Sequence, residues 1–184
     1  MTRLLVVCTA NICRSPMAEA LFKRRAADRD PTLVVRSAGL LESGQPAAPG
    51  TLRALQLAGL DGSAHVSQKL TADFAEKADV VLGMERRHVQ EVSLLAPAAF
   101  PRSFTLKELV RRGDQVGSRG RDESLSQWLQ RLQAGRTPRD LLGSDTSDDV
   151  ADPYGGEEEG YERTLRELDG LVARAVDLMW PPPL

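Results

Sequence analysis

The chain has 184 residues, of which 41% are hydrophobic and 27% charged, and its 24 basic and 26 acidic side chains leave a formal charge of −2. This composition is ordinary for a globular protein, and without excess positive charge a nucleic acid is disfavoured as the main partner. The apolar stretch 4–7 is too short for the core of a signal peptide, and no run reaches membrane-spanning length. We therefore expect a cytoplasmic protein with one domain over residues 1–184.

The N-terminal half alternates between apolar runs and amphipathic segments. Residues 3–8 (RLLVVC), 33–39 (LVVRSAG) and 78–84 (ADVVLGM) are short apolar runs typical of strands in a parallel sheet. Between them, the patterns predict helices at 15–28 and 51–60. Strand and helix alternate, and this order predicts an α/β fold.

The C-terminal half is expected to add one short strand and three more helices. The predicted elements are a helix from residue 86, a strand within 100–106, and helices over 122–133 and about 157–179. Loops are predicted at 113–121 and 143–149, which are polar and rich in Gly, Ser or Asp, and a stiff tail at 180–184.

The stretch CTANICRSP (residues 8–16) joins the first predicted strand to the first predicted helix and holds both cysteines of the chain. Such a junction binds anions in doubly wound sheets, because unpaired amides and the helix dipole point at the bound group. Neither GxxxxGK[ST] nor GxGxxG is present, so nucleotide sites of those types are excluded. Cys8 and Arg14 instead predict a nest for a tetrahedral oxyanion, closed by two parallel hydrogen bonds from the guanidinium.

The position of Cys8 suggests a chemical role. Helix N-terminus, amides and guanidinium together favour a thiolate. A thiolate beneath a bound phosphorus atom is placed for in-line attack, which points to phosphoryl transfer through a cysteinyl-phosphate. The alternative is a small core residue, the more common use of a cysteine that ends a buried strand. The spacing of Cys8 and Arg14 by itself leaves both open.

Several motifs together resemble those of the low-molecular-weight protein tyrosine phosphatases. They are CTANICRSP, SAG at 37–39, GQP at 44–46, HVSQKLT at 65–71, ADVVLGM at 78–84 and ADPYG at 151–155. The resemblance implies a three-layer α/β/α (Rossmann-like) fold around a central four-stranded parallel sheet, and a two-step phosphomonoesterase without metal or cofactor. It also implies that Cys8 is the nucleophile, that Arg14 binds phosphate and stabilises the transition state, and that Asp152 is the general acid and base.

The predicted phosphate site is the loop itself, with Tyr154 as an aromatic wall able to stack on an aryl phosphate. The binding residues in the loop are Thr9, Ala10, Asn11, Ile12, Cys13, Arg14 and Ser15. Asn11 is expected to turn the loop, since asparagine tolerates a left-handed backbone, and the resemblance implies that Ser15, Ser37 and His65 hold it. Ser15 is predicted to be the N-cap of the first helix and can also hydrogen-bond the thiolate.

Asp152 has support of its own, because Pro153 restrains it to extended geometry and Tyr154 lies beside it. A carboxylic acid opposite Cys8 could protonate the leaving oxygen and then activate water. The competing acids are Asp145, Asp148 and Asp149, in a polar run expected to be flexible. An ordinary turn is the alternative interpretation of the DPY motif.

The second cysteine and the two histidines carry structural predictions. Cys13 is either a small buried residue or, as the resemblance implies, the partner of Cys8 in a reversible disulfide that protects an oxidised nucleophile. His65 is predicted to be structural and not a base. His88, on a charged helix, is predicted to lie at the surface.

The chain departs from the family pattern at several positions. Ala10 replaces a glycine, so we expect an ordinary negative φ there, because alanine at positive φ would cost about 1–2 kcal/mol. The short LLES between SAG and GQP lacks an aromatic wall, Gly155 replaces a second tyrosine, and Glu85 replaces an aspartate. The segment of about 95–150 is longer than in typical relatives. The missing aromatic wall weakens the expected preference for phosphotyrosine, while the catalytic set is complete.

Three functions remain open from the sequence. The first is a phosphatase of phosphotyrosine proteins or small aryl phosphates, expected to be a monomer or weak dimer. The second is an arsenate reductase of the same fold that uses a small-molecule thiol, since the chain has no third cysteine for an internal relay. The third is an idle phosphate-binding module, which the presence of Cys8, Arg14 and Asp152 disfavours.

Overall fold

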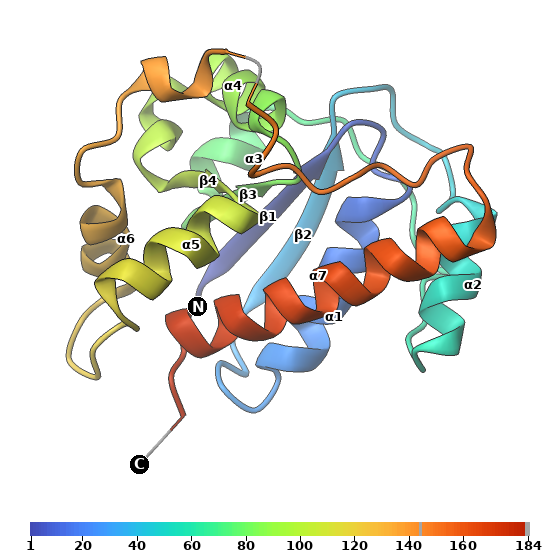
Figure 1. The fold of residues 1–184 in the computed structure, drawn as a ribbon, viewed down its shortest axis with the longest axis horizontal. Helices are drawn as coiled ribbons and strands as arrows, with labels where there is room; N and C mark the ends of the chain where they lie inside the picture. Colours follow the sequence, from blue (N-terminus) through green and yellow to red (C-terminus); the bar gives the residue numbers. More distant parts are fainter. Residues whose placement is uncertain (144, 183–184) are drawn as a thin grey trace.

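Four parallel strands form one sheet at the centre of the computed structural model, which describes residues 1–143 and 145–182 (Figure 1). The strands are β1 (Arg3–Cys8), β2 (Val34–Gly39), β3 (Val80–Gly83) and β4 (Ser103–Thr105), in the order β2-β1-β3-β4. Each lies within a range predicted from its apolar run. The predicted α/β fold with a four-stranded parallel sheet is therefore confirmed.

Helices connect and follow the strands. They are α1 (Arg14–Ala26), α2 (Pro49–Leu57), α3 (Ala72–Lys77), α4 (Arg86–Leu95), α5 (Leu106–Val116), α6 (Leu125–Gln133) and α7 (Glu158–Met179), with 3-10 helices η1 (Pro97–Arg102) and η2 (Pro138–Leu141). The predicted helices at 15–28, 51–60, 122–133 and 157–179 and from residue 86 correspond to α1, α2, α6, α7 and α4, with ends shifted by at most three residues.

Each face of the sheet carries its own core, because side chains alternate along a strand. In β1, Leu4 and Val6 face a large cluster that α1, α5 and α7 complete, while Leu5 and Val7 face a smaller one with α3 and α4. Figure 1 shows α1 and α7 lying along the first of these faces. The result is three layers with helices on both sides of the sheet, as the resemblance implied.

Helix α5 was not predicted, and the loop expected at 113–121 is wrong for residues 113–116, which are its last turn. The polar run around Gly113 resembles a loop in composition. In the structure Gly113 lets α5 approach α7 closely, because a Cβ there would lie 2.6 Å from Cδ1 of Leu178. Helix α3 was also missed; Thr71 caps it by accepting a hydrogen bond from the amide of Phe74.

The predicted loop at 143–149 and the predicted tail at 180–184 each fall partly outside the described residues, at 144 and at 183–184. The remaining loop residues are irregular, as expected. Trp180 differs from the prediction of a tail, because it is buried in the main core. No helix in residues 1–143 and 145–182 is both long and apolar enough to cross a membrane.

The strand order reverses between β1 and β3, since the chain first builds β2 on one side of β1 and later β3 on the other. At such a switch point the connections leave in opposite directions and open a crevice beyond the carboxyl ends of the strands. The stretch 8–16 begins at that end of β1. Its position is therefore the usual binding crevice of a doubly wound sheet.

Candidate active site

The loop between β1 and α1 wraps around the sulfur of Cys8. The amide of Asn11 donates a 3.2 Å hydrogen bond to Sγ of Cys8, and Oγ of Ser15 lies 2.9 Å from the same sulfur. The first amides of α1 follow directly and have no partner within the helix. Cys8 thus lies among donors at a helix N-terminus, which is the setting predicted for an anion site.

Asn11 fixes the shape of this loop. Its φ is 56°, the left-handed conformation expected from the sequence. Its Nδ2 donates to Oγ of Ser15 and of Ser37, both at 2.8 Å, and its carbonyl oxygen lies 2.6 Å from Nε2 of His65. Its Oδ1 accepts from the amide of Gln68 at 2.8 Å, a contact that was not predicted. The predicted partners of Asn11 are all present.

Ser15 is not the N-cap that the sequence predicted. The N-cap of α1 is Cys13, which makes no side-chain capping bond. The hydroxyl of Ser15 is instead engaged by Asn11 and lies beside Cys8. The second predicted role, a hydroxyl next to the sulfur, is the one that the geometry shows.

Two small residues shape the backbone of the loop. Among the described non-glycine residues only Asn11 has a positive φ, so the expected negative φ of Ala10 is confirmed. Gly39 ends β2 directly against the loop, where a Cβ would lie 2.7 Å from the amide nitrogen of Asn11. This contact explains why the SAG motif ends in glycine.

Arg14 lies at the centre of the site with only 1% of its side chain exposed. Nη1 donates to Glu85 and, at 2.8 Å, to the carbonyl oxygen of Val150, while Nη2 donates to Oδ2 of Asp152 at 2.8 Å. Nε is buried and has no hydrogen-bond partner in the described structure. An unsatisfied buried N–H costs about 1–3 kcal/mol, so Nε is a donor available to an oxyanion, whereas Nη2 is engaged by Asp152 and, at 3.3 Å, by Oγ1 of Thr9.

Asp152 reaches Arg14 from the loop that precedes α7. Its side chain is 37% exposed, and its Oδ1 accepts from the amide of Tyr154 at 3.2 Å. The other three candidate acids contact other groups: Asp145 and Asp149 bind Arg86, and Asp148 binds Arg111. Of the four, Asp152 is the one that meets Arg14.

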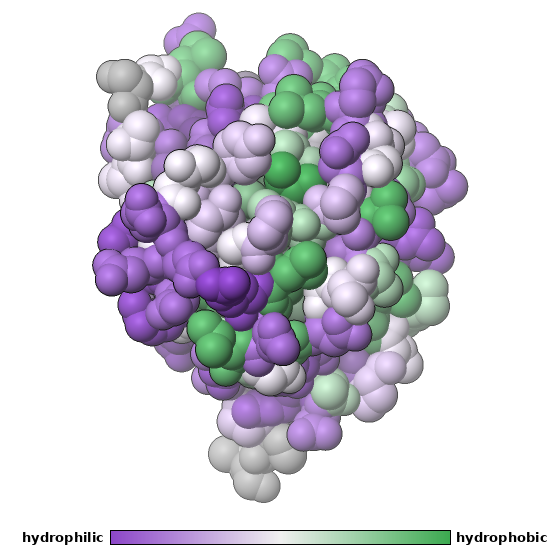
Figure 2. Space-filling view, turned by 90° about the vertical axis from the view of Figure 1, so that its right-hand side faces the viewer, coloured by the Kyte–Doolittle hydropathy of each residue, from purple (hydrophilic) through white to green (hydrophobic). Residues whose placement is uncertain are grey.

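A cavity of about 750 Å³ opens above the loop. Its lining residues are Cys8, Thr9, Ala10, Ile12, Cys13, Leu40, Leu41, Glu42, Gln45, Pro46, Ala47, Ala48, Pro49, Asp152 and Tyr154. Figure 2 turns this side of the molecule toward the viewer and shows apolar side chains gathered near the middle with hydrophilic ones around them. Tyr154, 68% exposed, stands at the cavity as the sequence predicted.

His88 contradicts the prediction of a surface residue. It is fully buried, because Glu85 and His88 cap α4 reciprocally and turn the ring inward. Nδ1 accepts from the amide of Glu85 at 2.9 Å, so Nε2 carries the proton and donates to Oγ1 of Thr9 at 3.2 Å. Burial lowers the pKa of His88 to about 3, so the ring is neutral. The spacing of a Glu and a His three residues apart at a helix start could have indicated this cap.

Two charged residues of the site were missed as functional candidates. Glu85 accepts one hydrogen bond from Nη1 of Arg14, and Arg87 Nε lies 2.6 Å from Oε2 of Glu85. Arg87 Nη2 also donates to Oγ1 of Thr9 at 2.6 Å. Burial alone would raise the pKa of Glu85, but the hydrogen bond and charge of Arg14 hold it below its usual range. Glu85 is therefore ionised and partly neutralises Arg14.

Cys13 is buried at the start of α1, with Thr51 and Tyr161 beside its thiol. Burial raises the pKa of the Cys13 thiol to about 11, so it is protonated. Both cysteines are free thiols in this structure. The small buried residue foreseen for Cys13 is what the structure shows, and the disulfide with Cys8 stays a prediction.

Comparisons with known proteins agree with this geometry. A family model described as low molecular weight phosphotyrosine protein phosphatase matches residues 3–117, which is more than half of the chain. A protein-arginine-phosphatase of Bacillus subtilis is 35% identical over 170 residues, covering 92% of this chain and 91% of that protein. A low molecular weight protein tyrosine phosphatase from T. tengcongensis superposes with a TM-score of 0.73 at 29% identity, covering 96% of this chain and 99% of that one. A YwlE arginine phosphatase, mutated from cysteine to serine and carrying a phosphorylated active-site serine, superposes with a TM-score of 0.71 at 33% identity, covering 97% and 95%.

Proposed function

The chain belongs to the low molecular weight phosphotyrosine protein phosphatase family and is an enzyme of that class. From this premise we propose that it hydrolyses phosphotyrosine or related aryl phosphates through a phosphorylated Cys8. Arg14 binds the phosphate, and Asp152 is the general acid and base. The observation that carries the proposal is the buried, unpartnered Nε of Arg14 next to the loop that surrounds the sulfur of Cys8.

In the first step the thiolate sulfur of Cys8 attacks phosphorus, and the bond from phosphorus to the phenolic oxygen breaks. The developing charge on the transferring group is met by Nε and Nη2 of Arg14, a fork that matches two phosphate oxygens. Asp152, in its protonated form, donates its proton to the departing oxygen. Its partial exposure and its position at the cavity support this role, and a bound phosphate replaces it on Nη2 of Arg14.

In the second step water attacks phosphorus, and the sulfur–phosphorus bond breaks. Asp152, now a carboxylate, accepts the proton from the water. The hydroxyl of Ser15, 2.9 Å from Sγ of Cys8, donates to the departing thiolate and stabilises it. Inorganic phosphate and the free thiolate are the products, so the cycle consumes no reductant.

An aryl phosphate suits the cavity because its walls are largely apolar. Leu40, Leu41, Pro46 and Ile12 offer a surface for a phenyl ring, and Tyr154 can stack on it. Phosphoarginine is a second candidate, since the Bacillus relative is named for it and the carboxylates of Glu42 and Asp152 could face a guanidinium in the same cavity. Hydrolysis rates on matched peptides with phosphotyrosine, phosphoarginine or phosphoserine decide between these substrate classes.

An arsenate reductase of the same fold stays as an alternative, because arsenate has the shape of phosphate. Production of arsenite that depends on added thiol, at a rate above hydrolysis of p-nitrophenyl phosphate, would favour it. Efficient hydrolysis without arsenite production would favour the phosphatase.

Replacement of the nucleophile gives the most direct test. Cys8→Ser is expected to abolish turnover of p-nitrophenyl phosphate, because a serine hydroxyl in this loop is a much poorer nucleophile than a thiolate. Binding of inorganic phosphate, measured by calorimetry, should persist because Arg14 and the amides remain. Turnover near the wild-type rate in the variant would rule out Cys8 as nucleophile.

A further inference from the structure

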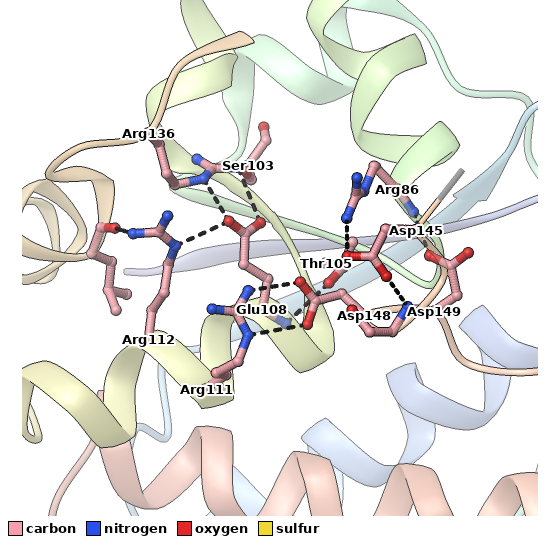
Figure 3. A network of polar contacts seen from close by, with 12 residues as sticks. Arg86, Ser103, Thr105, Glu108, Arg111, Arg112, Arg136, Asp145, Asp148 and Asp149 are labelled. Carbon is pink, nitrogen blue, oxygen red and sulfur yellow. Dashed lines mark hydrogen bonds and ion pairs between the residues drawn. The ribbon is translucent and has the colours of Figure 1, made fainter. Parts of the chain in front are cut away.

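The segment of residues 145–150, which precedes Asp152, is bound to α4 and α5 through its carboxylates (Figure 3). Asp148 accepts two hydrogen bonds from Arg111 of α5, from Nε at 3.2 Å and from Nη2 at 2.7 Å. Asp149 accepts from the backbone amide of Arg86, the first residue of α4, at 2.8 Å, and Asp145 from Nη2 of the same arginine at 3.3 Å. The segment thus binds two helices that follow different strands.

One face of α5 forms ion pairs with both ends of the stretch of residues 136–148, which leads into this segment. Glu108, Arg111 and Arg112 lie three and four residues apart and therefore share a face of the helix. Glu108 accepts from Nε of Arg136 at 2.7 Å, at the beginning of this stretch, and Arg111 binds Asp148 at its end. Figure 3 shows these two ion pairs side by side above α5.

Further hydrogen bonds hold the chain between Asp149 and Asp152. One residue after Asp149, the amide of Val150 donates to the carbonyl oxygen of Met84 at 2.8 Å, and the carbonyl oxygen of Val150 accepts from Arg14. Asp152 follows two residues later, with Pro153 limiting its backbone. Few free torsions therefore separate Asp148 from the carboxyl group of Asp152.

We propose that Arg111, through Asp148, is a positioning residue that fixes the loop carrying Asp152 over the bound phosphate. This rests on the proposed role of Asp152 as general acid. Arg111 is half exposed and lies outside the residues that line the cavity, so it acts through Asp148 and not on the substrate. The pair is half buried, with 50% of the Arg111 side chain and 14% of the Asp148 side chain exposed, so we expect its main effect on the placement of the acid and only a modest one on stability.

Leaving-group dependence separates acid placement from other defects. Phenol is a poor leaving group, with a pKa near that of tyrosine, about 10, and needs a proton donor, whereas p-nitrophenol leaves more easily. The value of kcat/KM reports the first step, in which the bond between phosphorus and the phenolic oxygen breaks. For Arg111→Ala we expect a loss of about tenfold with phenyl phosphate and less than about threefold with p-nitrophenyl phosphate. Asp148→Asn should show the same selectivity, and Arg111→Lys should recover part of the loss.

A matched control lies on the same helix. Asp114 of α5 accepts from Nε of Arg174 at 2.7 Å, with both side chains 48% exposed, and touches neither the loop nor the cavity. Asp114→Asn removes a surface ion pair from α5 without reaching Asp152, so both substrates should react at wild-type rates. Urea denaturation of each variant checks that the fold is retained.

Asp152→Ala, measured in parallel, distinguishes the two levels of the proposal. A large loss confined to phenyl phosphate in Asp152→Ala, with a smaller loss of the same kind in Arg111→Ala, supports both. A selective loss in Asp152→Ala with no selectivity in Arg111→Ala overturns the positioning role alone. No selectivity in Asp152→Ala overturns the acid role and the positioning role with it.

Discussion

The loop of residues 8–14 and the segment of residues 145–152 meet at Arg14, but different contacts hold them. Around Asn11 the contacts are buried hydrogen bonds between neutral groups, and the loop packs on Gly39 without space for a Cβ. Around Asp148 and Asp152 the contacts are ion pairs in which one partner, Arg111 or Asp152, is partly exposed. The proposed phosphate site is therefore held by buried contacts of the fold, whereas the proposed proton donor, Asp152, lies on a segment that ion pairs attach to it.

This difference teaches which step each region can serve. A transferring phosphoryl group gains most from donors already in place, because they need no reorganisation as charge develops. A group that first protonates the leaving oxygen and then accepts a proton from the attacking water must be reached by both, so partial exposure suits it. Variants on the two sides should accordingly fail in different ways.

The largest effect is expected at the residue that both regions share. Arg14→Lys keeps the charge but removes the planar fork and the free Nε, so kcat/KM for p-nitrophenyl phosphate should fall by about 10²–10³-fold. Inorganic phosphate should also inhibit the variant much more weakly than the wild type. Near-normal kinetics would mean that a point charge suffices and that the fork of Arg14 is not the phosphate ligand.

The next largest effect should distinguish the loop of residues 8–14 from the segment of residues 145–152 by their contributions to stability. Asn11→Ala removes the hydrogen bonds to Ser15, Ser37 and Gln68 and leaves alanine at a positive φ. The free energy of unfolding should fall by about 2–3 kcal/mol, with a loss of activity, as measured by urea denaturation and steady-state kinetics. The matched change Asp148→Asn should affect kinetics without a comparable loss of stability. Equal stability losses in both variants would remove the contrast between the regions.

The smallest effect concerns His88, which donates a hydrogen bond to Oγ1 of Thr9. The folded protein keeps this ring neutral down to pH about 3, whereas in the unfolded chain it protonates near pH 6.5. Between these values the unfolded state binds the extra proton, so stability falls as the pH is lowered. Relative to His88→Gln, the wild type should lose about 1 kcal/mol more per pH unit below pH 6.5. Parallel stability curves from pH 7 to pH 5 would mean that His88 is charged in the folded state.

The sequence predicted the elements whose signals are local. The apolar run of β1 and the loop chemistry of Cys8, Asn11 and Arg14 lie within a dozen residues, and the periodicity of α7 needs no partner to be seen. Ser15 was assigned as N-cap because serine before proline fits that role, but Asn11 and Cys8 engage its hydroxyl. A local pattern cannot show that a distant contact takes a side chain away from its usual use.

The remaining features depend on pairs that are far apart in the chain. Arg111 and Asp148 are separated by 37 residues, and each reads as a solvated charge on its own. The charged residues around His88 predict exposure, whereas its cap with Glu85 turns the ring inward and Thr9, 79 residues away in the chain, receives its hydrogen bond. The sequence does not predict α5, and its last turn in particular resembles a loop because Gly113 serves contact with α7, which composition does not reveal.

The two ion pairs on α5 also bear on how this chain tolerates changes of length. The chain leaves α5 at Gly117, passes through an exposed turn at residues 120–122, and returns to α5 at Arg136 and again at Asp148. Since both ion pairs to α5 lie between this turn and Asp152, extra residues at the turn are expected to extend into solvent without displacing Asp152. This turn is therefore the place to insert a fluorescent label, an affinity tag or a targeting module while the cleft keeps its geometry.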